Sequence, residues 1–73
     1  MPWEVNVLFR HEEEDRVLPI LDEMATFWGG SVGVSGSEHQ GWEFPWEEHA
    51  QSFAREAHNR LPNVTVIEPE AKM

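Results

Sequence analysis

The first half of the chain changes from a strand pattern to a helix pattern. Residues 3–9 alternate between apolar and polar side chains, which is typical of a strand with one buried face. From about Asp15 to residue 28 the apolar residues recur at helical spacing, and a helix that begins there keeps Pro19 close to its first turn. Gly29-Gly30 follows and predicts the end of this helix, because glycine readily adopts a left-handed cap.

The second half of the chain predicts two further strands, one helix and a last strand. Apolar residues alternate with small ones over residues 32–34, and the polar, glycine-containing residues 35–41 indicate a hairpin loop. Residues 42–46 alternate again, although the proline within them is expected to end that strand. Two glutamates then open a helix over residues 47–61, and residues 64–67 predict the final strand.

The order β-α-β-β-α-β is the split β-α-β arrangement called ferredoxin-like. Right-handed crossovers then give an α+β two-layer sandwich, with an antiparallel sheet of strand order 4-1-3-2 and two helices on one face. We expect residues 1–68 to form this single domain and residues 69–73 to be a polar C-terminal tail. The strand alternation and the apolar lines of the helices predict a core made of Val5, Val7, Phe9, Ile20, Leu21, Met24, Phe44, Phe53, Ala57, Val64 and Val66.

The composition narrows the class of protein. A chain of 73 residues has a small core, and its four Trp and four Phe supply much of the apolar area that such a core needs. The absence of cysteine excludes a disulfide framework and a thiolate metal site. No apolar run approaches the length of a membrane span, and the N-terminal residues lack the layout of a signal peptide. We therefore expect a cytoplasmic protein without a cofactor.

The charge is the most unusual property of the sequence. Fourteen acidic residues face five basic ones, which gives a formal net charge of −9. Such a surface repels nucleic acid and anionic membranes, whereas it attracts proteins with a basic surface. The alternative is that the acidity only keeps the protein soluble.

The predicted topology gathers many of the acidic residues at the two ends of the sheet. One end is expected to carry Glu12, Glu13, Glu14, Asp15 and Glu38, and the other Glu4, Glu47, Glu48, Glu68 and Glu70. Acids in the first turn of a helix stabilise it by about 0.3–1 kcal/mol each, which accounts for residues 12–15 and 47–48 without any partner. Helix stabilisation does not account for Glu4, Glu38, Glu68 or Glu70.

Two features of the sequence suggest chemistry rather than binding. His11 and His39 are both expected at one end of the sheet near acidic residues, and imidazole with carboxylate suits a transition metal, although their spacing enforces no geometry. Pro2 would become a free secondary amine on removal of Met1, and an N-terminal proline resembles the catalytic base of the small tautomerase family. That resemblance implies arginines in the pocket, and here Arg10, the basic residue of the first strand, lies at its far end.

A non-enzymatic binding protein agrees best with the acidity. The expected partner is a protein with a basic surface, and the concrete form is an inhibitor that occupies a nucleic-acid-binding groove as a phosphate mimic. Small acidic proteins of phages and mobile elements, including some anti-CRISPR proteins, resemble this chain in size, charge and predicted fold. The partner-binding candidates are Glu12, Glu13, Glu14, Asp15, Glu38, Glu47 and Glu48.

Leu8 and Ile67 add an apolar candidate. Both are expected on the face of the sheet that the helices leave open, on neighbouring strands, so they predict a patch for partner docking or weak homodimerisation. Two alternatives stay open at this point. One is a small enzyme or metal-binding protein built on Pro2 or on His11 and His39, and the other is a dimeric structural or interaction module without activity.

Overall fold

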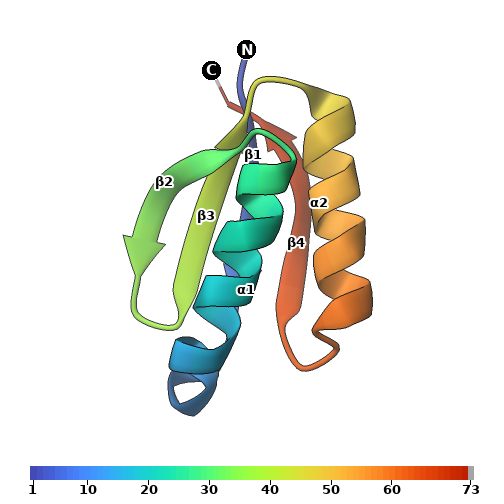
Figure 1. Cartoon of the computed structure of the whole chain (residues 1–73). Helices are drawn as coiled ribbons and strands as arrows, with labels where there is room; N and C mark the ends of the chain where they lie inside the picture. The colour runs from blue at the N-terminus through green and yellow to red at the C-terminus, as the bar shows by residue number, and fades with distance from the viewer. Residues whose placement is uncertain (73) are drawn as a thin grey trace.

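The computed structural model describes residues 1–72 and confirms the ferredoxin-like fold (Figure 1). The sheet has the order β2-β3-β1-β4, and every neighbouring pair of strands is antiparallel. The elements are β1 (Trp3–Leu8), the 3-10 turn η1 (His11–Glu13), α1 (Glu14–Phe27), β2 (Ser31–Gly36), β3 (His39–Phe44), α2 (Glu47–Arg60) and β4 (Thr65–Ala71).

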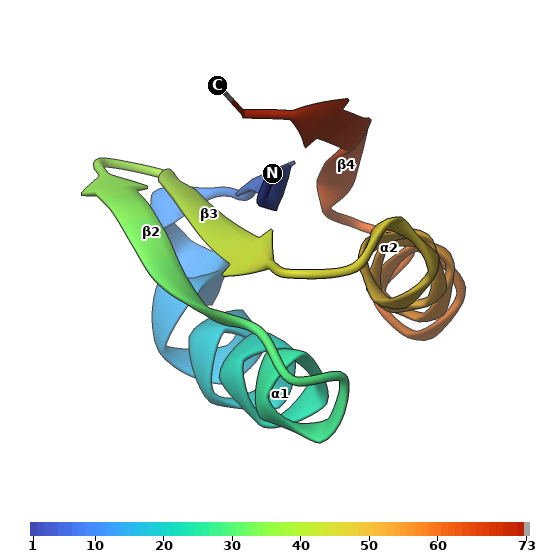
Figure 2. The same cartoon turned by 90° about the horizontal axis from the view of Figure 1, so that it is seen from above.

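Both helices cover the same face of the sheet, and the core lies between the two layers (Figure 2). Phe53 of α2 is fully buried, and its ring centroid lies 5.4 Å from that of Trp42 and 5.0 Å from that of Phe44. Most of the predicted core is buried, but Ile20 and Val66 are only half-buried at its margin. The buried set also contains residues that the prediction omitted, namely Val17, Ala25, Trp42, Ala50 and Leu61.

The hairpin between β2 and β3 is shorter than predicted. The β2–β3 turn consists of Ser37 and Glu38 alone, because a positive φ of 59° at Glu38 reverses the chain within two residues. His39 and Gln40 therefore belong to β3 rather than to a loop. β3 ends at Phe44, which confirms the prediction that Pro45 ends this strand. Trp46 is the extended residue that precedes α2, and its side chain is exposed.

The expected C-terminal tail is a further correction. β4 continues to Ala71, since Glu70 pairs with Glu4 and Ala71 pairs with Trp3 across a bulge in β4. The backbone amide of Lys72 then donates to the carbonyl of Pro2 at 2.8 Å. Polarity suggested a frayed tail, but β1 offers paired backbone groups along its whole length and these extend the strand. Of the predicted tail, residue 73 lies outside the described residues.

No helix among residues 1–72 is both long and apolar enough to cross a membrane.

Candidate acidic binding surface

The face of the sheet opposite the helices carries acidic residues in one line. Along β1, Val5 and Val7 point into the core, so Glu4 points to the open face. The register places Glu4 directly opposite Glu43 of β3 on one side and Glu70 of β4 on the other. We call Glu43, Glu4 and Glu70 the glutamate row. Like charges that face one another across neighbouring strands are destabilising, so this row costs the fold stability.

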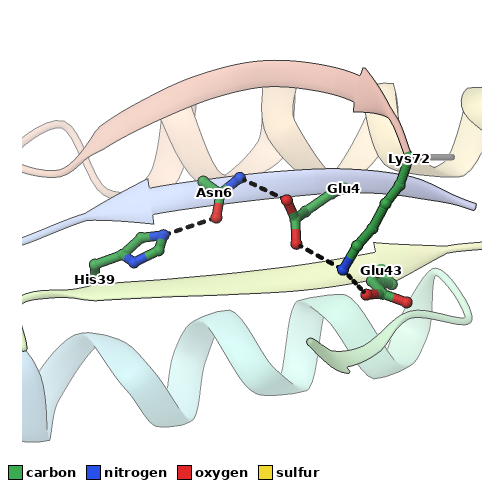
Figure 3. Close-up of polar contacts among 5 residues, drawn as sticks. All are labelled: Glu4, Asn6, His39, Glu43 and Lys72. Atoms are coloured by element: carbon green, nitrogen blue, oxygen red, sulfur yellow. Dashed lines mark hydrogen bonds and ion pairs between the residues drawn. The ribbon is translucent and has the colours of Figure 1, made fainter. Parts of the chain in front are cut away.

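Lys72 compensates part of this repulsion. Its Nζ lies 2.6 Å from Oε2 of Glu43 and 3.5 Å from Oε2 of Glu4, so two carboxylates share one ammonium group (Figure 3). The hydrogen bond to Glu43 raises the pKa of Lys72 above its ordinary value, with the charge of Glu4 as a smaller cause. The Oε2 atom of Glu4 is buried and accepts no hydrogen bond within residues 1–72, so the Lys72 ion pair is its compensating contact.

A line of polar contacts continues from Glu4 toward the hairpin. The side-chain amide of Asn6 donates to Oε1 of Glu4 at 3.2 Å, and Nε2 of His39 lies 2.7 Å from Oδ1 of Asn6 (Figure 3). Because that oxygen can only accept, the Nε2 atom of His39 carries the proton and donates it. We call Glu4, Asn6, His39, Glu43 and Lys72 the open-face network.

Gly41 makes room for this network. It pairs with Asn6 across β1 and β3, and a Cβ atom at Gly41 would lie 2.6 Å from Oδ1 of Asn6. A glycine weakens the interior of a strand, but a larger residue here would push the Asn6 amide away from its partners. The close approach of Asn6 to the β3 backbone therefore explains a glycine in the middle of β3.

At the hairpin end of the sheet, Glu38 lies beside the residues that begin η1. Oε2 of Glu38 accepts a hydrogen bond from the backbone amide of His11 at 3.2 Å, and its carbonyl accepts one from Phe9 at 3.1 Å. These contacts hold the β2–β3 turn beside η1, which is the lower end in Figure 1. Glu12 and Asp15 are exposed there, whereas Glu13 is half-buried and forms an ion pair with Arg16.

Glu47 and Glu48 lie at the opposite end, in the first turn of α2. Both are exposed, and Glu47 accepts a hydrogen bond from Gln51 at 3.2 Å. Figure 1 shows the start of α2 at the same end of the molecule as the two chain termini. The structure therefore separates these two glutamates from the acids near the hairpin.

The remaining candidates are distributed as follows. Leu8 and Ile67 lie on the open face of neighbouring strands, 40% and 41% exposed, with Leu8 opposite Thr65 and Ile67 opposite Asn6. Pro2 is exposed near the C-terminal end of β4, and Arg10 follows the other end of β1.

The histidines are not joined into a ligand set. The Nε2 atom of His39 is engaged with Asn6, while His11 lies in η1. Within residues 1–72, no group of three or more His, Cys, Asp or Glu residues is arranged to hold a metal ion. The two histidines therefore share one end of the sheet without forming a centre.

Sequence reasoning missed Lys72. A lysine after a proline and two glutamates looks like part of a solvated tail, and only the extension of β4 brings it back over the sheet. The single signal was that this chain has no other lysine to neutralise its glutamates. Comparison with protein-family models, curated proteins and solved structures finds no match to this chain.

Proposed function

We propose that this protein is a non-enzymatic binding protein whose partner presents a basic surface, and that it acts as an inhibitor by occupying a nucleic-acid-binding site of that partner. The observation that carries the proposal is the glutamate row, in which Glu43, Glu4 and Glu70 face one another across three strands. A fold gains nothing from aligning three carboxylates around one lysine. A partner that places arginine or lysine against the open face relieves this repulsion. The free energy that the repulsion costs the free protein then contributes to the affinity for that partner.

The distribution of basic residues supports the proposal. Three of the five cations are already paired within the chain, in the Arg16–Glu13, Arg60–Glu56 and Lys72–Glu43 ion pairs. The acidic residues outnumber them so strongly that the surface remains negative. An exposed carboxylate such as that of Glu70 accepts arginine in a bidentate pair, as phosphate oxygens do, which is the chemical basis for mimicry of a phosphate backbone.

Leu8 and Ile67 extend the same surface. They lie on the open face beside Asn6, so a partner that covers the glutamate row also reaches this apolar pair. A charged row with a small apolar patch beside it is the composition of a protein contact, because apolar burial adds affinity where charge adds rate and specificity. The acids near the hairpin, Glu12 and Glu38 among them, contribute to the long-range attraction.

The test uses a partner captured from a cell lysate on the immobilised chain and then purified. Its affinity is measured from about 0.05 to 0.5 M salt, with and without duplex DNA, because exposed charges are strongly screened over that range. We expect binding to weaken steeply with salt and to be competitive with the DNA. The variant Glu4→Gln/Glu70→Gln keeps the Glu43–Lys72 pair and should slow association by about tenfold. The control Asp22→Asn/Glu68→Gln removes the same charge away from the glutamate row, keeps the Oδ1 atom that accepts from Trp42, and should have a smaller effect.

Charge-reversal variants test the contribution of each acidic end of the sheet to association separately. Reversal of Glu12, Glu13 and Glu38 to lysine should slow association if the hairpin end steers the partner, and reversal of Glu47 and Glu48 tests the other end in the same way. Each variant is first checked for an unchanged melting temperature. Affinity that does not depend on salt, or a partner that still binds DNA when saturated with this protein, would contradict the proposal. If every charge-reversal variant associated with the partner as the wild type does, the acidity would serve only to keep the protein soluble.

A further inference from the structure

The helical layer carries a groove between the end of α1 and the second half of α2. Two adjoining clefts of about 210 and 530 Å³ share Phe27, Glu56 and Arg60 among their lining residues. Phe27 is 76% exposed, and its ring lies edge-on to that of Trp28 with the centroids 5.0 Å apart. Phe27 and the half-buried Trp28 thus give the groove an aromatic edge that a partner can cover.

The groove differs from the rest of the surface in its charge. Its lining residues include two acids, Glu23 and Glu56, and two bases, Arg55 and Arg60, so it is locally neutral. The entire net charge of −9 therefore belongs to the remainder of the chain. A basic partner is drawn toward the acidic faces rather than to this groove. A second copy of the chain, in contrast, meets least repulsion where the charge is balanced.

The walls of the groove are held in place by contacts within the chain. Nε1 of Trp28 donates to Oε1 of Glu56 at 3.0 Å, and Nη1 of Arg60 donates to Oε2 of the same carboxylate at 3.3 Å. The Trp28 ring also lies 5.9 Å from the ring of His49, centroid to centroid. These contacts tie α1 to α2, so the surface is formed before any second copy arrives, and less entropy is lost on association.

We propose that this groove is the interface of a homodimer in which two copies associate groove to groove. A two-fold axis parallel to the groove places α1 of each copy against α2 of the other, as an isologous contact requires. Glu23 of one copy then faces Arg60 of the second copy, and the converse pair forms at the same time. The two Phe27 rings cover the clefts near the axis and lose their exposure to water.

This dimer leaves the open face of each sheet uncovered, since the helices and the open face lie on opposite sides of the sheet (Figure 2). Its salt dependence is the reverse of that expected for a basic partner. Two copies of charge −9 repel one another at long range, so screening by salt should strengthen the dimer. Dimerisation and the proposed partner binding are therefore measured independently.

Sedimentation equilibrium of the full chain, over a range of concentrations at low and high salt, tests the proposal. The wild-type chain should dimerise with rising concentration, and more tightly at high salt. Phe27→Ala should weaken dimerisation by about tenfold or more, the loss expected for a central aromatic anchor, and its melting temperature should equal that of the wild type at concentrations where both are monomeric. Trp46→Ala is the matched control, because Trp46 is an exposed aromatic residue that lines neither cleft, and it should dimerise as the wild type does.

A charge swap identifies the contact directly. Glu23→Arg and Arg60→Glu should each weaken the dimer, because each places like charges across the axis. A mixture of the two variants should form a heterodimer more tightly than either variant forms a homodimer, because both contacts between copies then join opposite charges. A wild-type chain that stays monomeric at every concentration and salt would overturn the proposal. So would a Phe27→Ala dimer as tight as that of the wild type, or a dimer that is lost only on Leu8→Ser/Ile67→Ser, which would place the contact on the open face.

Discussion

The two faces of the sheet are built from the same strands but are stabilised in different ways. On β3, Trp42 and Phe44 point toward the helices and are completely buried, whereas His39 and Glu43 on the alternate positions remain partly exposed. The core face is held by close packing of large side chains, which are surrounded on every side. On the open face, the described side chains instead form a line of polar contacts that runs from His39 through Asn6 and Glu4 to Lys72.

This difference indicates which face of the sheet determines the stability of the fold and which face can change with little effect on stability. Changes on the core face should alter stability strongly, because buried groups cannot move away from a new neighbour. Changes on the open face should alter charge and hydrogen bonding with little loss of stability, since side chains there can turn toward water. The three glutamates aligned on the open face are therefore not required for the packing of the core.

The largest expected effect is on the core face. Phe53→Ala removes the ring that contacts both Trp42 and Phe44, so it should lower the free energy of unfolding by about 3–5 kcal/mol. Domains of this size have little more stability than that, so the variant should be largely unfolded. Leu8→Ala on the open face is the control and should change stability by less than about 0.5 kcal/mol. Thermal and urea unfolding measure both, and equal losses would contradict the packing.

Alanine substitutions at two glycines compare the two faces more directly. The methyl group added at Gly30 meets the core face, and the one added at Gly41 meets the open face. A Cβ at Gly30 would lie 2.7 Å from Cζ of Phe44, whose ring is buried and packed on Phe53, so Gly30→Ala should cost about 1–3 kcal/mol. A Cβ at Gly41 meets the Asn6 amide, which can rotate toward water. Gly41→Ala should therefore cost only about 1 kcal/mol, because the displaced amide exchanges its two hydrogen bonds, to Glu4 and His39, for hydrogen bonds to water.

The Gly41 variant has a second measurable consequence. Displacement of the Asn6 amide breaks its hydrogen bond to His39, so the NMR signals of the His39 ring should shift in Gly41→Ala and stay unchanged in Gly30→Ala. Thermal and urea unfolding also show which of the two variants, Gly30→Ala or Gly41→Ala, is the less stable. A Gly41 variant less stable than the Gly30 variant would mean that the open face is packed as rigidly as the core.

The smallest expected effect is the alkaline dependence of stability. The pKa of Lys72 is raised in the folded chain, so the folded chain binds this proton more tightly than the unfolded chain does. The resulting stabilisation is complete below the unfolded pKa of about 10.4 and is lost as the pH rises through the folded value. The chain has no tyrosine, cysteine or other lysine, so Lys72 is the one side chain that titrates in this range.

The melting temperature should therefore stay level from about pH 9 to 10 and fall at higher pH. Lys72→Met should melt at a lower temperature at neutral pH, because Glu4 and Glu43 then face each other without a cation, and it should show no such alkaline fall. If the variant lost stability in the same alkaline range as the wild type, the ion pairs of Lys72 would not contribute to the fold.

Much of the fold could be predicted because its signals are local. The alternation of Val5 and Val7 with polar residues identifies β1 and its buried side, and the helical spacing of Leu21 and Met24 identifies α1. The element order then leaves few topologies, and the observed one is the expected one. Boundaries were less predictable, since β4 extends into residues 68–71 through pairing with β1 rather than through its own composition.

The sequence by itself determined the order of the elements, the side of each strand that is buried, and the large negative charge, because each depends on residue type and spacing along the chain. The tertiary structure alone decided that Glu43, Glu4 and Glu70 stand in one row, since that depends on strand register. It also decided that Lys72 reaches two of these carboxylates, and that Phe27 lies beside a neutral groove. These contacts join residues far apart in the chain, and no local pattern encodes their distances.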